Sequence, residues 1–168
     1  MSGRRALFTS LLRLGEADPD GPGWPRPPGA LSEADFLRAC TRCGDCIEAC
    51  PHGAIGTLPS GPTAGTPAMN PNVAPCHLCE DTPCITACED GALAPVGAAG
   101  ILLGIAMVDP ERCLPFRGPE CGACRNSCPV GALHTSLGRP SIDSKVCNGC
   151  GLCRADCPVW DKAIEIIF

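Results

Sequence analysis

The chain has 168 residues and a formal net charge of −5 at pH 7, and its longest run of basic residues is Arg4-Arg5. The basic stripe that is typical of nucleic-acid-binding proteins is therefore missing. Four Phe, two Trp and no Tyr stand beside 16 Cys, 19 Pro and 20 Gly, which excludes a core built mainly from large apolar side chains. A cysteine content this high indicates either a disulfide scaffold or a metal-binding protein.

The N-terminal segment, residues 1–17, is predicted to form an amphipathic helix, because Leu7, Leu11 and Leu14 share one helical face. Its twin arginine is similar to the start of an export signal, but Arg13 interrupts the apolar stretch that export requires. We therefore expect a cytoplasmic protein. Cytoplasmic thiols stay reduced, so metal binding is favoured over disulfides.

Two segments are predicted to connect structured parts of the chain. Residues 18–30 are rich in Pro and Gly and indicate a flexible linker ahead of the body, residues 31–168. Residues 57–75 form a long loop that is either a plain surface loop or a lid or partner contact. The longest apolar run, residues 96–108, is too short to span a bilayer, so no transmembrane segment is expected.

Every cysteine belongs to one of four groups whose first members lie 36, 37 and 34 residues apart. The groups are Cys40, Cys43, Cys46 and Cys50; Cys76, Cys79, Cys84 and Cys88; Cys113, Cys121, Cys124 and Cys128; and Cys147, Cys150, Cys153 and Cys157. This is an internal repeat of about 35 residues. Each unit is predicted to contain a strand, a cysteine loop, a short helix, a turn and a second strand. Strands are expected before the third and fourth groups and at residues 163–168.

The first and fourth groups follow the spacing Cys-x2-Cys-x2-Cys-x3-Cys-Pro, which is typical of bacterial ferredoxins that hold [4Fe–4S] clusters. Zinc would explain two Cys-x2-Cys pairs but would leave the third thiol without a role. The loop must wrap around the cluster, and the glycines between the ligands supply the backbone freedom for this. These are Gly44, Gly122, Gly149 and Gly151.

The second and third groups depart from this spacing. Four residues separate Cys79 from Cys84, and seven separate Cys113 from Cys121. Such insertions can bulge outward without moving the thiols, although altered clusters or one lost site are alternatives. The predicted fold is α+β: loop-rich, bacterial-ferredoxin-like repeats in two modules of two [4Fe–4S] clusters each, with short strands and helices around the clusters.

The sequence resembles the NapF/NapG/MauM group of ferredoxin-type proteins. The matching stretches are "RPPGAL", "CTRCGDCIEACP", "TAGTP", "CHLCEDTPC", "VDPERCLPFRGPEC" and "CNGCGLCRADCP". At the N-terminus "GRRALF" is more similar to the cytoplasmic NapF branch. The resemblance implies four [4Fe–4S] clusters with all sixteen cysteines as ligands. Redox protein partners are also expected, with a molybdoenzyme or a membrane subunit that oxidises quinol as candidates, but the resemblance does not identify the partner, because this group serves several redox systems.

"CHLCEDTPC" also resembles the iron–sulfur subunits of molybdenum oxidoreductases, and this likeness implies a nested exchange of fourth ligands. The implied ligand sets are Cys40, Cys43, Cys46 and Cys157; Cys76, Cys79, Cys84 and Cys128; Cys113, Cys121, Cys124 and Cys88; and Cys147, Cys150, Cys153 and Cys50. Exchange between adjacent groups is the alternative.

The predicted function is electron transfer, because a chain of such clusters moves single electrons. No catalytic triad, phosphate-binding loop or flavin motif is recognisable, so we expect a carrier and not an enzyme. His52, His77 and His134 lie in or just after cysteine groups and are interpreted as neighbours of clusters, not ligands. The alternatives are a maturation factor for a molybdenum reductase and a permanent iron–sulfur subunit of a larger oxidoreductase.

Overall fold

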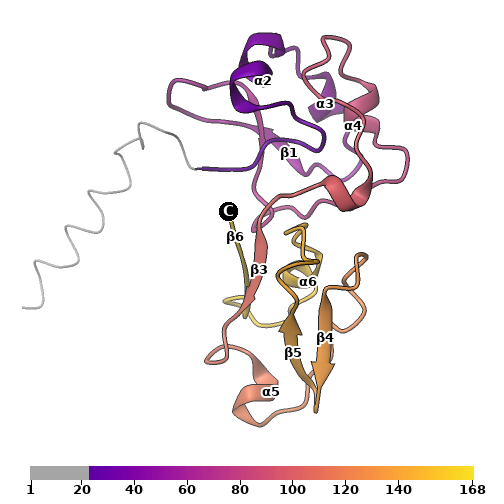
Figure 1. Ribbon diagram of the computed structural model, residues 1–168. Coiled ribbons are helices and arrows are strands. Elements are labelled where there is room, and N and C mark those ends of the chain that lie inside the picture. Colours follow the sequence, from indigo (N-terminus) through magenta and orange to yellow (C-terminus); the bar gives the residue numbers. More distant parts are fainter. Residues whose placement is uncertain (1–22) are drawn as a thin grey trace, which may run out of the picture.

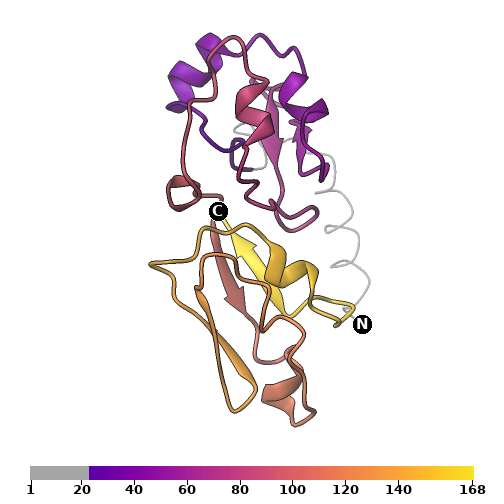
Figure 2. The same ribbon diagram turned by 90° about the vertical axis from the view of Figure 1, so that its right-hand side faces the viewer.

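A computed structural model describes residues 23–168 of the chain (Figures 1 and 2). The predicted helix at residues 1–17 and the first part of the predicted linker lie outside these residues. In both views the described chain forms two halves, and β3 (Ile105–Val108) lies in the second of them. We therefore define residues 23–103 as the N-terminal half and residues 104–168 as the C-terminal half.

The N-terminal half contains α2 (Glu33–Ala39), α3 (Asp45–Glu48), β1 (Ile55–Thr57), β2 (Pro67–Met69), α4 (Pro83–Thr86) and the 3₁₀ turn η2 (Ala98–Gly100). The C-terminal half contains β3 (Ile105–Val108), α5 (Leu114–Arg117), β4 (Leu133–Ser136), β5 (Arg139–Ile142), α6 (Leu152–Ala155) and β6 (Ile164–Ile167). These short helices and strands, separated by long loops, confirm the loop-rich α+β fold.

Helix α2 is the longest helix among the described residues, and local signals define both its start and its buried face. Ser32 caps the helix by accepting a hydrogen bond from the Asp35 amide, and Glu33 and Asp35 place negative charge in the first turn. Phe36 is fully buried and anchors the helix to the body. The helix occupies the position where a strand was predicted before the first cysteine group.

Three antiparallel sheets of two strands each support the loops: β1 with β2, β3 with β6, and β4 with β5. The pairing of β3 with β6 joins segments about 60 residues apart in the sequence and closes the C-terminal half, with Val108 opposite Ile164. Strands β3, β5 and β6 confirm the strands predicted before the third and fourth groups and at the end of the chain.

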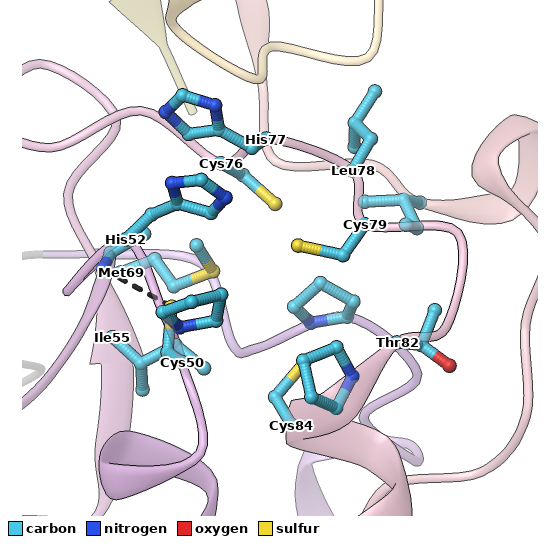
Figure 3. Close-up of a pocket in the computed structure, with 15 residues that line it drawn as sticks. Cys50, His52, Ile55, Met69, Cys76, His77, Leu78, Cys79, Thr82 and Cys84 are labelled. Atoms are coloured by element: carbon cyan, nitrogen blue, oxygen red, sulfur yellow. Dashed lines mark hydrogen bonds between the residues drawn. The ribbon is translucent and has the colours of Figure 1, made fainter.

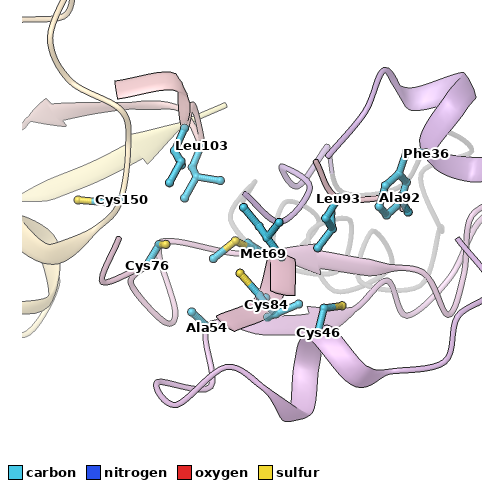
Figure 4. Packing of buried hydrophobic residues seen from close by; sticks show 13 residues of the cluster. Phe36, Cys46, Ala54, Met69, Cys76, Cys84, Ala92, Leu93, Leu103 and Cys150 are labelled. Atoms are coloured by element: carbon cyan, nitrogen blue, oxygen red, sulfur yellow. The ribbon is translucent and has the colours of Figure 1, made fainter. Parts of the chain in front are cut away.

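The buried core is assembled from unusually small side chains. Of the 24 apolar residues buried within residues 23–168, seven are cysteines and six are alanines. The largest fully buried apolar side chains are Phe36, Met69, Leu103, Ile164 and Ile166. Figure 4 shows how cysteines occupy positions in the core beside Met69, Leu93 and Leu103. Much of the interior is therefore lined by thiols.

Residues 23–30, the described part of the predicted flexible linker, are packed against the body. Pro27 and Pro28 are buried, and the Gly29 carbonyl accepts a hydrogen bond from the Ala94 amide at 2.6 Å. Arg26 lies over the Phe36 ring at 4.7 Å and donates to the Thr66 hydroxyl at 2.7 Å. Proline and glycine here allow an extended segment to pack closely against the body. Within residues 23–168, no helix is long and apolar enough to cross a membrane.

Candidate metal-cluster sites

The sixteen thiols are all free and are gathered into four sets of four. Three sets line cavities: set 1 with Cys40, Cys43, Cys46 and Cys88; set 2 with Cys76, Cys79, Cys84 and Cys50; and set 3 with Cys113, Cys121, Cys124 and Cys157. The remaining cysteines form set 4 in the C-terminal half: Cys147, Cys150, Cys153 and Cys128. Desolvation raises the pKa of Cys150 and of Cys153, and the neighbouring Cys147 and Cys128 raise both further. Each set combines three cysteines of one group with the last cysteine of the adjacent group.

Set 2 is drawn in Figure 3, where cysteines from two segments surround one cavity. The Cys76 and Cys79 side chains approach it from the loop before α4, and Cys84 approaches from α4 itself. Cys50 completes the ring from the first cysteine group. The other lining residues are mostly prolines and apolar side chains, so the thiols are the principal metal donors facing this space.

The nested exchange of fourth ligands does not match this arrangement. In the structure Cys88 joins Cys40, Cys43 and Cys46, whereas the nested scheme placed Cys157 there. In each of the other three sets the fourth cysteine also comes from the adjacent group. It is Cys50 in set 2, Cys157 in set 3 and Cys128 in set 4. The physical reason is local packing. Helix α3 lies against α4, so the last cysteine after each helix reaches the neighbouring set and no set in the other half.

A backbone hydrogen bond to the sulfur recurs at three of these four fourth cysteines. The amide four residues after Cys50 and after Cys128 donates to the cysteine sulfur, from Ala54 at 3.4 Å and from Ala132 at 3.1 Å. In the fourth group two extra residues lengthen the turn, and the Ala163 amide donates to the Cys157 sulfur at 3.4 Å. Such N–H groups stabilise thiolate charge and tune a bound cluster.

The turns around the thiols depend on residues in the left-handed backbone region. Gly44 and Gly151 begin α3 and α6 with φ of 92° and 88°, as the sequence predicted. Gly149 is also left-handed, whereas Gly122 is not among the residues with positive φ. Arg42, Leu78 and Thr82 adopt positive φ without being glycine. No sequence pattern indicated these three positions, because non-glycine residues with positive φ are uncommon.

Burial raises the pKa of many of these thiols. The pKa of Cys46 and of Cys76 rises to about 11, and that of Cys153 to about 12, first because of desolvation and then because neighbouring thiols disfavour a second negative charge. Four thiolates in one such set therefore need a compensating positive charge. Ferric and ferrous ions provide it, and thiolates are their usual ligands in iron–sulfur proteins.

A single zinc ion fits the sets poorly. Within residues 23–168, no three Cys, His, Asp or Glu side chains converge closely enough to hold one ion. Tetrahedral zinc at about 2.3 Å from each sulfur would bring thiols to roughly 3.8 Å from one another. The thiols instead surround a wider space, which suits a cluster of several metal ions.

Two of the three histidines lie beside set 2. The imidazoles of His52 and His77 stack on each other, with ring centroids 3.6 Å apart and planes 8° apart, at the rim of the set 2 cavity (Figure 3). The pKa of His77 is lowered, mainly by desolvation and secondarily by His52. His134 is exposed on β4.

Comparison with known proteins identifies the family. A 4Fe-4S dicluster domain matches residues 39–92, and 4Fe-4S binding domains match residues 120–132 and 144–160. The ferredoxin-type protein NapG of Escherichia coli (strain K12) is 38% identical over 161 residues, which cover 84% of this chain and 69% of NapG. The chain belongs to this family of ferredoxin-type proteins.

Two further relatives define the family's breadth. The methylamine utilization ferredoxin-type protein MauM of Paracoccus denitrificans is 37% identical over 163 residues, covering 84% of this chain and 70% of MauM. The ferredoxin-type protein NapF of Escherichia coli (strain K12) is 32% identical over 130 residues, covering 74% of each chain. Over the aligned residues the chain is thus more similar in sequence to these NapG and MauM proteins than to this NapF. The predicted similarity to the NapF branch rested only on the first residues of the chain, "GRRALF".

Family membership and the thiol sets together establish an iron–sulfur protein with a role in electron transfer. When bound, a [4Fe–4S] cluster supplies a centre that accepts and releases one electron.

Proposed function

We propose that the protein carries four [4Fe–4S] clusters, one in each thiol set, and relays single electrons between a redox donor and an oxidoreductase partner. The observation that carries this proposal is the grouping of the sixteen thiols into four sets of four, three of which line cavities. The sets pair within each half, which supports two ferredoxin-like modules, residues 31–103 and 104–168. The dicluster match over residues 39–92 falls within the first of them.

The chain's own residues define what each site does. Three thiolates from one loop and one from the adjacent group hold the iron, and backbone amides donate to the sulfurs. Prolines and apolar side chains exclude water from the sites, which keeps bound clusters from hydrolysis and oxidation. We propose that the protein is a carrier without a substrate site of its own, and the ferredoxin-type relatives support this.

An anaerobic redox titration tests this function. The proposal predicts reversible uptake of about four electrons per chain, one for each cluster, with the EPR signals of reduced [4Fe–4S] centres. After reoxidation under argon the iron content should be unchanged. A protein that retained its iron yet took up no electrons would contradict the carrier role.

Partner choice is expected to follow from an uneven charge distribution. Residues 23–103 contain three Arg and Lys against eight Asp and Glu, a net charge of −5, whereas residues 104–168 contain seven of each. Set 1 includes Cys43, which is exposed, whereas the other fifteen cysteines are buried or half-buried. We therefore propose a redox partner with a basic face, such as a subunit of a molybdoenzyme or a quinol-oxidising complex, that docks on the N-terminal half.

Neutralising an acidic residue near Cys43 should slow association with such a partner. We expect Glu48→Gln to lower the rate of electron exchange with a small basic redox protein by roughly two- to threefold at low salt, because long-range attraction is reduced. Glu111→Gln is the matched control, because Glu111 is also exposed but lies in the half whose net charge is zero. This variant should change the rate little. Stopped-flow kinetics at several ionic strengths measure both variants. Equal slowing by the two would argue against docking on the N-terminal half.

The compartment forms part of the same proposal. We place the protein in the cytoplasm, where sixteen free thiols stay reduced and available for cluster assembly. Fractionation of cells that express the full chain, followed by immunodetection, tests this placement. The family relatives favour neither a maturation factor nor a permanent subunit over the carrier role.

A further inference from the structure

The junction between the two halves brings a cysteine of set 2 against a cysteine of set 4. The Cys76 amide donates to the Cys150 carbonyl oxygen at 2.7 Å, and nearby the Leu103 amide donates to the Asn148 carbonyl at 2.8 Å. Figure 4 shows Cys76, Cys150 and Leu103 together where the two halves meet. Both cysteines are buried. This contact therefore lies inside the molecule, between two sites that belong to different halves.

Within each half the sets are connected differently, by short covalent stretches. One helical turn leads from Cys46 in set 1 to Cys50 in set 2, and another leads from Cys84 back to Cys88. In the C-terminal half the corresponding four-residue steps join set 3 and set 4, from Cys124 to Cys128 and from Cys153 to Cys157. No such covalent step joins a set of one half to a set of the other.

From these connections we infer a single-file order of the sites: set 1, set 2, set 4, set 3. We propose that the hydrogen bond from the Cys76 amide to the Cys150 carbonyl is the bridge over which electrons pass between the halves. The proposal rests on the proposed function, since it assumes that the thiol sets hold clusters. It places set 1 and set 3 at the ends of the path, where Cys43 is exposed and Cys121 also lines an open surface groove.

Glycines on both sides of Cys150 make the close approach possible. A Cβ at Gly151 would collide with the carbonyl oxygen of Pro71, and a Cβ at Gly149 would collide with the backbone of Gly104. Residues 148–151 are all buried. The fourth cysteine loop therefore fits against Pro71 of the N-terminal half because Gly151 carries no side chain, and Gly149 lets the same loop lie against Gly104 at the start of the C-terminal half.

Asn72, near the end of the predicted loop at residues 57–75, forms hydrogen bonds that stabilise this junction. The Asn72 amide group donates to the Ile166 carbonyl at 2.8 Å, and the Asn72 side-chain oxygen accepts from the Ile166 amide at 2.8 Å. Arg154 donates to the Asn72 carbonyl at 2.9 Å and to the Ile164 carbonyl at 2.6 Å. The end of this loop thus connects the N-terminal half to strand β6 and helix α6. The sequence predicted a plain surface loop, a lid or a partner contact here, whereas the structure shows a contact within the chain.

A matched pair of glycine variants tests the bridge. Gly151→Ala should displace Pro71 and separate the Cys150 carbonyl from the Cys76 amide. Gly65→Ala is the control, because Gly65 also has a positive φ, of 79°, lies outside the cysteine groups, and its Cβ would meet only the Arg42 side chain at 3.6 Å, an ordinary contact. Both variants place alanine at a positive φ, so the junction is what distinguishes them.

The readouts are iron content, the EPR spectrum of the fully reduced protein, and freeze-quench EPR after addition of one electron equivalent. We expect Gly151→Ala to retain its iron, to lose the magnetic interaction between the two middle sites, and to redistribute the electron between halves more slowly. Gly65→Ala should match the wild-type protein in both EPR experiments. Unchanged interaction and redistribution in Gly151→Ala would overturn the bridge.

A second pair keeps the test decisive if Gly151→Ala fails to fold. Asn72→Ala removes the two side-chain bonds to Ile166, whereas Asn70→Ala removes only a bond to the Asn72 amide within the same loop. The bridge predicts the loss of interaction in Asn72→Ala alone, and equal behaviour of the two overturns it. Wild-type protein without iron would instead refute the proposed function, so the two failures are distinguishable.

Discussion

Removal of iron is expected to unfold most of the described body. Seven of the 24 buried apolar residues are cysteines and six are alanines, so the side chains left without a cluster form too little core to offset the loss of chain entropy. Cluster binding is then coupled to folding, as it is in small metal-dependent domains. The unfolded chain should lose dispersed NMR signals and become rapidly digested by proteases.

The experiment compares protein treated anaerobically with an iron chelator and oxidant against protein carried through the same steps without them. Circular dichroism, proton NMR and limited proteolysis follow the outcome. Reconstitution with iron and sulfide under reducing conditions should restore the native spectra. If the iron-free protein kept a dispersed spectrum and resisted proteolysis, the thiol sets would not be the structural centre of the fold.

Pairs of cysteine variants are expected to reveal which thiols share a cluster. Cys88→Ala alone should lower the iron content by about four atoms, because it removes one ligand of set 1. Adding Cys40→Ala should lower it no further, since both cysteines belong to the same set. Adding Cys113→Ala should instead double the loss, since Cys113 belongs to set 3.

This comparison works because two substitutions at one cluster site do not lower the iron content more than one does, whereas the losses from substitutions at two independent sites add up. The nested scheme predicts the reverse outcome, with Cys88 and Cys113 acting as one site and Cys40 as a second. Iron and sulfide analysis of anaerobically purified variants measures the loss, and the remaining EPR signals show whether the other clusters are intact. Additive loss with Cys40 and non-additive loss with Cys113 would contradict the adjacent arrangement.

The sequence predicted those features that depend on short stretches of chain. Ligand spacing in each group, glycines such as Gly44 and Gly151, and the strand at residues 164–167 are set by local backbone geometry and side-chain alternation. Insertions in the second and third groups were expected to bulge without displacing thiols. The structure agrees: the insertion after Cys113 forms helix α5, and Cys113 still lines the cavity with Cys121.

Features that depend on packing between distant segments were not predictable in the same way. The assignment of Cys88 to set 1 follows from α3 lying against α4, and no local pattern specifies that contact. The burial of Pro27 likewise requires the body that it packs against, so composition alone indicated a linker. Asn72 carried no recognisable motif, although its side chain joins the two halves through Ile166.

The most direct test of the central claim is the metal content of the intact protein purified without exposure to air. Iron and acid-labile sulfide analysis combined with Mössbauer spectroscopy should give about sixteen of each per chain, all in [4Fe–4S] clusters. A brown protein with this composition is the predicted result. A colourless, folded protein that contained zinc or disulfides in place of iron and sulfide would contradict the account.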